Sequence, residues 1–120
     1  MDDAKFSISM PRGDIKKVRF TVLTNDSQIV ETDFDDIYFT VKKHFLDPNF
    51  LFQKRLSNGD IIKLDNSDYQ FTIEPNDTDN LKFDTYDCDI EIVSLADELK
   101  QTFTGVFEVT SEATHARNEG

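Results

Sequence analysis

Residues 86–93 read Tyr-Asp-Cys-Asp-Ile-Glu-Ile-Val, and this stretch decides the fold class. Apolar or aromatic side chains alternate with carboxylates along it. A period of two residues is the pattern of a β-strand that buries one face and leaves the other in water. The inward positions of the expected strand are Tyr86, Cys88, Ile90 and Ile92, and the outward positions are Asp87, Asp89 and Glu91.

The same period recurs along the chain. The other expected strands cover residues 18–23, 28–32, 37–42, 50–56, 61–64, 69–73 and 101–110. Turn-forming residues separate them about every 8–12 residues, which is the spacing of a β-sandwich rather than of alternating strands and helices. Expected turns outside the hairpin described next are residues 24–27, 65–68 and 97–98.

Three local signals refine this pattern. Asn58-Gly59 lies between two strand runs and predicts a hairpin, because a type I′ turn needs positive φ at both central residues. Residues 77–81 predict a single helical turn capped by Asn76 or Asp77. Gly105 predicts a bulge or a close approach of another segment, within a last strand whose Phe103, Phe107 and Val109 face the core.

The composition agrees with an all-β domain. The 120 residues include 17 Asp but only 7 Glu, together with 11 Phe and 3 Tyr. Asp disfavours helix and strand interiors because its short carboxylate competes for nearby backbone N–H groups, whereas aromatic residues suit a pleated surface. We therefore expect Asp-rich turns between aromatic strands.

The spacing of Tyr86 and Cys88 points to a particular sandwich. Tyr86 precedes Cys88 by two residues, with Thr78 and Leu81 just upstream, which is where a tyrosine corner bonds back to the chain in immunoglobulin-like domains. The chain has one cysteine and no Trp. We expect an antiparallel immunoglobulin-like β-sandwich of 7–8 strands without a disulfide. Cys88 would be a small buried apolar residue, with a reactive thiol as the alternative.

The expected sandwich spans residues 11–112. Residues 1–10 would form an N-terminal arm or a short strand, and residues 113–120 a flexible polar tail.

The net charge of −11 bears on partners. A nucleic-acid partner requires clustered Lys and Arg to displace counterions, and an anionic membrane attracts basic segments, so we expect neither partner. No apolar run approaches the roughly 18 residues of a membrane span, and Met1-Asp2-Asp3 lacks the basic start of a signal peptide. We expect a soluble, unprocessed chain.

Residues for catalysis are few. Only His44 and His115 could act as general bases near neutral pH, and they lie in a Pro-flanked loop and in the tail. We expect no enzymatic activity, and neither a cofactor nor a metal ion. A calcium-dependent ligand- or carbohydrate-binding module is the alternative, since Ca²⁺ prefers oxygen ligands. Its candidate clusters are Asp33/Asp35/Asp36, Asp65/Asn66/Asp68 and Asp77/Asp79/Asn80.

Candidate contact residues lie in two places. Phe45, Leu46 and Phe50 make the loop of residues 44–50 more apolar than a loop needs, although it could instead pack across one end of the sandwich. Asn58 and Gly59 form the expected hairpin tip.

Other short motifs have simpler explanations. Arg12-Gly13-Asp14 spells an integrin-ligand tripeptide, but a three-residue match at the entrance to a strand is weak. The basic residues at 16–17 and 42–44 are interpreted as charges that protect strand edges from aggregation.

Several strings together resemble one family. They are Arg12-Gly13-Asp14, Phe39-Thr40-Val41-Lys42-Lys43, Phe52-Gln53-Lys54, residues 69–75, Asp77-Thr78 with Leu81, residues 86–90 and residues 105–109. In this order and spacing they are similar to small phage and prophage proteins related to the immunoglobulin-like N-terminal domain of phage baseplate upper proteins, over about residues 11–112.

The resemblance implies a structural or assembly module of a tail, baseplate or capsid, with no catalytic residues. Its partners would be phage structural proteins or further copies of itself, in a virion or in the host cytoplasm.

Overall fold

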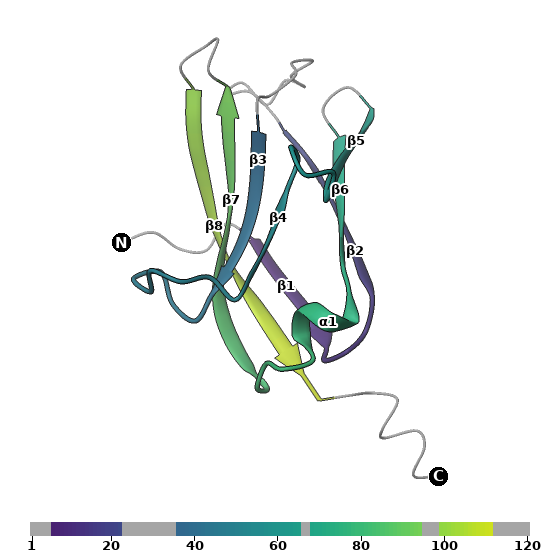
Figure 1. Cartoon of the computed structure of the whole chain (residues 1–120), viewed down its shortest axis with the longest axis vertical. Coiled ribbons are helices and arrows are strands. Elements are labelled where there is room, and N and C mark those ends of the chain that lie inside the picture. Colours follow the sequence, from purple (N-terminus) through teal and green to yellow (C-terminus); the bar gives the residue numbers. More distant parts are fainter. Residues whose placement is uncertain (1–5, 23–35, 66–67, 95–98, 112–120) are drawn as a thin grey trace.

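The computed structural model describes residues 6–22, 36–65, 68–94 and 99–111 (Figure 1). Strands dominate this part of the chain, together with one short helix. The elements are β1 (Phe6–Pro11), β2 (Lys16–Thr21), β3 (Asp36–Lys42), β4 (Phe52–Arg55), β5 (Ile61–Asp65), β6 (Asp68–Ile73), α1 (Pro75–Thr78), β7 (Asp84–Ser94) and β8 (Leu99–Thr110).

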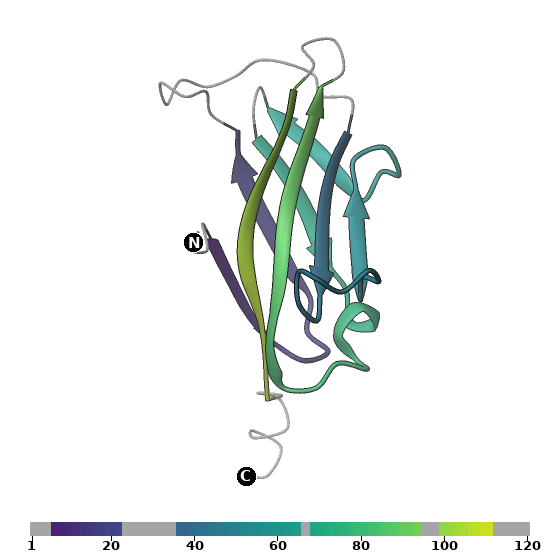
Figure 2. The same cartoon turned by 90° about the vertical axis from the view of Figure 1, so that its left-hand side faces the viewer.

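The strands form two sheets. One has five strands in the order β1-β8-β7-β3-β4, and the other has three strands in the order β2-β6-β5. The two sheets face each other, and buried residues from both form one core (Figures 1 and 2). The expectation of an all-β fold without a disulfide is therefore confirmed.

One strand pair departs from the expected antiparallel arrangement. β1 runs parallel to β8, with partners from Phe6↔Gly105 to Pro11↔Thr110. A tight turn cannot connect parallel strands, and here β2 to β7 lie between the two in sequence. The prediction of a wholly antiparallel sandwich is wrong for this pair, because the alternation within a strand carries no information about its partner's direction.

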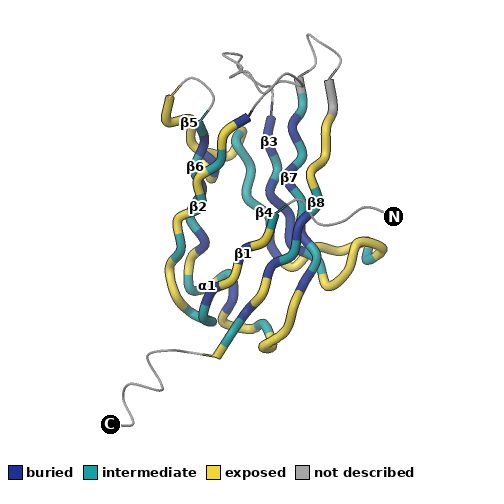
Figure 3. The backbone as a smooth tube through the Cα atoms, turned by 180° about the vertical axis from the view of Figure 1, so that it is seen from behind, coloured by how far each residue is buried: buried dark blue, intermediate teal, exposed yellow. Residues whose placement is uncertain are grey.

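Alternation correctly predicts most of the core. β3 buries Ile37, Phe39 and Val41, and β7 buries its four expected inward residues (Figure 3). Phe103 on β8 is an error, since 37% of its surface is exposed. Within the described residues, β1 pairs with β8 only from Gly105 to Thr110, so no described strand adjoins that side of Phe103.

The tyrosine corner has the expected hydrogen bond. Tyr86 Oη donates to the carbonyl oxygen of Lys82 at 2.7 Å. The bond ties the beginning of β7 to the segment that follows α1.

The helical turn is present, but it begins two residues earlier than predicted. α1 is Pro75–Thr78 with Glu74 as its N-cap, rather than Asn76 or Asp77. Pro75 favours this start because its fixed φ suits the first helical position and its missing N–H would have no helical partner there. Asp77 instead accepts a hydrogen bond from the backbone N–H of Glu74 at 2.8 Å.

The Asn58-Gly59 turn is present, but the hairpin is not. Gly59 has φ +84°, as expected for a turn glycine. However, β4 pairs with β3 whereas β5 pairs with β6, so this turn carries the chain from one sheet to the other. Each strand pairs within the sheet that buries its own apolar face, and this long-range preference overrides the local turn signal.

Some expectations lie outside the described residues. These are the turn at 24–27, the strand at 28–32, the turn at 97–98, the central residues of the turn at 65–68 and the tail at 113–120. In the part of the chain that the structure describes, no helix is long and apolar enough to cross a membrane.

Gly105 confirms the expected close approach. A Cβ atom at this position would lie 2.7 Å from the carbonyl oxygen of Phe6. We expect Gly105→Ala to lower the free energy of unfolding by about 1–3 kcal/mol, because the backbone of β1 must move away from β8. Urea denaturation measures this loss. A Gly105→Ala variant as stable as the wild type would contradict the β1–β8 register.

Candidate functional site

The connection between β3 and β4, residues 43–51, exposes an unusual amount of apolar surface. Leu46 is 92% exposed, and three further large apolar side chains on the same loop are also exposed: Phe50 at 52%, Phe45 at 44% and Leu51 at 41%. Single exposed apolar residues are normal on a protein surface, but a cluster of this kind is typical of a contact site. We name residues 43–51 the apolar loop.

The apolar loop projects away from the three-stranded sheet. In Figure 1 it extends to the left of β7 and β8, on the side of the five-stranded sheet that faces away from β2, β5 and β6. Figure 3 shows it as an almost continuous exposed segment. The alternative, in which the loop packs across one end of the sandwich, would cover Leu46 and Phe50, which are both exposed.

Two hydrogen bonds attach the apolar loop to the five-stranded sheet. The N–H of Leu51 donates to the carbonyl oxygen of Val41 at 2.7 Å, which closes the base. The N–H of Phe45 donates to Asp87 Oδ2 on β7 at 2.9 Å.

Turns inside the loop add two further bonds. The N–H of Asp47 donates to the carbonyl oxygen of His44 at 2.9 Å, and Asp47 Oδ1 accepts the N–H of Asn49 at 3.0 Å. An Asx turn of this kind orders a loop locally. The exposed side chains are therefore carried on a backbone with a defined conformation.

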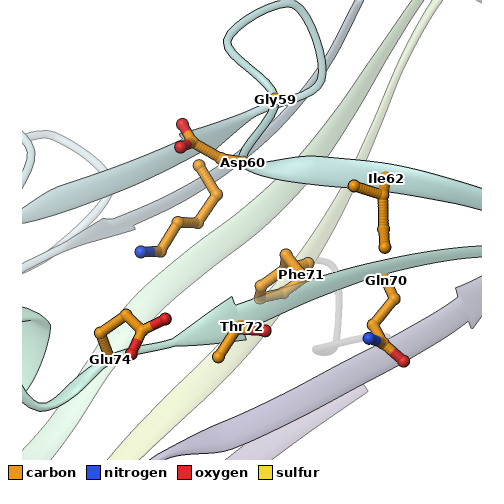
Figure 4. A pocket seen from close by; sticks show the side chains of 8 residues that line it. Gly59, Asp60, Ile62, Gln70, Phe71, Thr72 and Glu74 are labelled. Carbon is orange, nitrogen blue, oxygen red and sulfur yellow. The ribbon is translucent and has the colours of Figure 1, made fainter.

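The second candidate contact, Asn58 and Gly59, is an exposed turn beside a hollow of about 340 Å³ (Figure 4). The hollow is lined by Lys54, Gly59, Asp60, Ile62, Gln70, Phe71, Thr72 and Glu74. Its cation, Lys54, already pairs with Asp77 at 2.7 Å. The turn and the apolar loop lie at opposite ends of β4, so the two predicted contact regions do not form one site.

Asp36 is a buried carboxylate with a structural role that the sequence did not reveal. Only 8% of the residue is exposed. Its oxygens accept hydrogen bonds from Arg55 Nη2 at 3.0 Å, from Ser57 Oγ at 2.8 Å and from the Ser57 N–H at 3.0 Å. The carboxylate therefore holds the β4–β5 connection against the start of β3.

The same contacts set the acidity of Asp36. Burial raises its pKa, but the hydrogen bonds from Ser57, Arg55 and the N–H of Ile37 outweigh burial and lower the pKa to about 2.

Two of the three candidate calcium clusters lie partly outside the described residues. Within residues 6–22, 36–65, 68–94 and 99–111, no three His, Cys, Asp or Glu side chains converge as metal ligands. Asp36 and Asp77 instead bond to Arg55 and Lys54. Asp33, Asp35 and Asn66 lie outside the described residues.

The Arg12-Gly13-Asp14 string forms the turn between β1 and β2. The Arg12 guanidinium lies 4.3 Å from the centroid of the Phe83 ring, and the N–H of Gly13 donates to Oγ1 of buried Thr78 at 2.8 Å. Gly13 has φ +82°, a conformation that glycine adopts most readily. The string thus has a structural role at the α1 end of the sandwich.

The remaining reactive groups are two histidines and one cysteine. His44 is exposed on the apolar loop, and His115 lies outside the described residues. Cys88 is 1% exposed, as expected for a buried apolar residue. Burial, followed by the charges of Asp89 and Asp87, raises the pKa of the Cys88 thiol to about 12, so it is not a thiolate near neutral pH.

Comparisons with protein families, curated proteins and solved structures gave no match. The interpretation of the apolar loop therefore rests on its residues and their geometry.

The lowered pKa of Asp36 predicts a pH-dependent contribution to stability. The folded pKa of about 2 lies below the ordinary value of 3.8, so the contribution is present above about pH 4 and is lost as pH falls toward 2. We expect Asp36→Asn to cost about 2 kcal/mol at pH 7, and this difference from wild type should shrink toward pH 2.

Urea denaturation at several pH values measures this difference. Asp65→Asn is the control, since Asp65 is exposed, and its effect should stay below about 0.5 kcal/mol. Wild-type and Asp36→Asn stabilities that run parallel from pH 7 to pH 2 would contradict the role of Asp36.

Proposed function

We propose that this chain is a non-enzymatic, immunoglobulin-like β-sandwich that acts as a structural or assembly module of a phage or prophage particle. It works through protein–protein contacts, and the apolar loop is its main contact site.

The strand arrangement supports the immunoglobulin-like part of the proposal. If β1 to β8 correspond to strands A, B, C, C′, D, E, F and G, the β2-β6-β5 sheet has the B-E-D order and β8-β7-β3-β4 has the G-F-C-C′ order. The Tyr86 hydroxyl bond to Lys82 lies at the start of the strand that corresponds to F. One departure is that β1 joins the G strand rather than the B strand.

The exposure of the apolar loop is the observation that carries the contact function. Apolar side chains such as Leu46 and Phe50 lower the free energy when a partner removes them from water, by roughly 25 cal/mol per Å². Interface hot spots are well-packed apolar or aromatic groups of this kind at the centre of a contact. Hydrogen bonds already order the loop backbone, so binding requires less loss of conformational entropy.

The phage setting is supported by the order and spacing of the sequence strings that resemble baseplate-related domains. A particle also suits a small sandwich that offers a contact loop, because such assemblies are built from repeated protein contacts. The corresponding locations are the virion and, before assembly, the host cytoplasm.

Incorporation into particles tests this function. We expect the wild-type chain to co-purify with particles of its source phage, and Leu46→Ser/Phe50→Ser to reduce incorporation at least about tenfold, because two exposed anchors of roughly 1–2 kcal/mol each are lost. Quantitative immunoblotting of gradient-purified particles measures the incorporated amount. Stability should change by less than about 0.5 kcal/mol per substitution.

Ile15→Ser is the matched control, since Ile15 is 63% exposed on the β1–β2 connection, away from the loop. It should leave incorporation unchanged. The proposal fails if the wild-type chain is absent from particles, or if the loop variant is incorporated as well as the control.

A further inference from the structure

The outward face of β7 lies next to the apolar loop. Asp87, Asp89 and Glu91 alternate with residues that are buried on the core side. Figure 2 shows β8, β7 and β3 toward the viewer, and within the described residues no helix or other strand lies over them. In the described part of the chain, no further layer covers this face, on which Asp87, Asp89 and Glu91 are half-buried. We name Asp87, Asp89 and Glu91 the acidic row.

Asp89, in the middle of the acidic row, has few compensating charges beside it. Asp89 lies between Thr40 of β3 and Thr104 of β8, which are both neutral. Lys42 is the cation nearest in register, opposite Asp87. Burial and the charge of Glu91 raise the pKa of Asp89, and Lys42 only partly offsets this. A cation placed over Asp89 would relieve this unfavourable environment.

One hydrogen bond joins the row to the loop. Asp87 Oδ2 accepts the N–H of Phe45 at 2.9 Å, so the first carboxylate of the row also positions the loop. The apolar loop and the carboxylates of Asp87 and Asp89 are therefore adjacent on one side of the five-stranded sheet.

We propose that the apolar loop and the acidic row form one docking surface for a protein partner that surrounds an apolar pocket with Lys or Arg side chains. Leu46 would enter the pocket, and the partner's cations would lie over Asp87 and Asp89. A second copy of this chain fits poorly, because it brings the same acidic row and a net charge of −11. The inference rests on the proposed contact function of the loop and adds the chemistry of the partner.

Two synthetic peptides serve as probes of this chemistry. One alternates Lys with Leu, and the other replaces each Leu by Ser at the same charge. Titrations monitored by NMR at 0.15 M salt give both dissociation constants, under conditions where long-range attraction is largely screened. We expect the Lys/Leu peptide to bind wild-type protein about tenfold more tightly than the Lys/Ser peptide, and Leu46→Ser to remove that difference.

Charge variants distinguish binding at the acidic row from non-specific attraction between the basic peptide and the acidic protein. Asp87→Asn/Asp89→Asn/Glu91→Gln should weaken binding of the Lys/Leu peptide at least about tenfold. The matched control is Asp14→Asn/Asp65→Asn/Asp79→Asn, which removes three exposed carboxylates elsewhere and should weaken binding less than about threefold. The Asn at position 87 retains an oxygen that can accept the Phe45 N–H.

Three results would overturn the inference: no binding by wild-type protein, equal loss in the two triple variants, or equal affinity for the two peptides. Thermal melts of each variant confirm that it is folded before titration. If these titrations fail while Leu46→Ser/Phe50→Ser is still lost from particles, the contact function stands and the basic partner is wrong.

Discussion

The structure depends on one aromatic stack between the two sheets. Phe39 on β3 and Phe71 on β6 are almost fully buried, and their ring centroids lie 4.4 Å apart with an interplanar angle of 25°. The single cysteine cannot form an internal disulfide, so the sheets are joined without one. Stacked pairs of this kind contribute about 0.5–1.5 kcal/mol beyond the burial of their surface.

This packing also decides which side chains the five-stranded sheet directs outward. Because the core side of β3 and β7 is filled by apolar residues, the carboxylates of β7 must point outward, beside the β3–β4 connection. Asp87 then links strand and loop through the Phe45 N–H. The proposed contact function therefore depends on an exposed loop whose position is fixed by the packing of the sheet beneath it.

Alternation predicted the strands well because burial of one face is encoded locally, as in Ile37, Phe39 and Val41. The exposed Phe45, Leu46 and Phe50 could also be identified, since a loop rarely contains so many apolar residues. Three other features could not be predicted from the sequence. They are the parallel partner of β1, the sheet that the chain enters after Gly59, and the role of Asp36. Each depends on groups distant in sequence, such as Ser57 for Asp36.

The central claim is that the apolar loop is preformed on a rigid sandwich, ready to be covered by a partner. Amide hydrogen exchange of the isolated protein, followed residue by residue by NMR, tests it most directly. The account predicts that the Phe45 and Leu51 amides exchange at least about tenfold more slowly than in an unstructured peptide, because Asp87 and Val41 accept their hydrogen bonds. Exchange of both amides at the unstructured rate would contradict it.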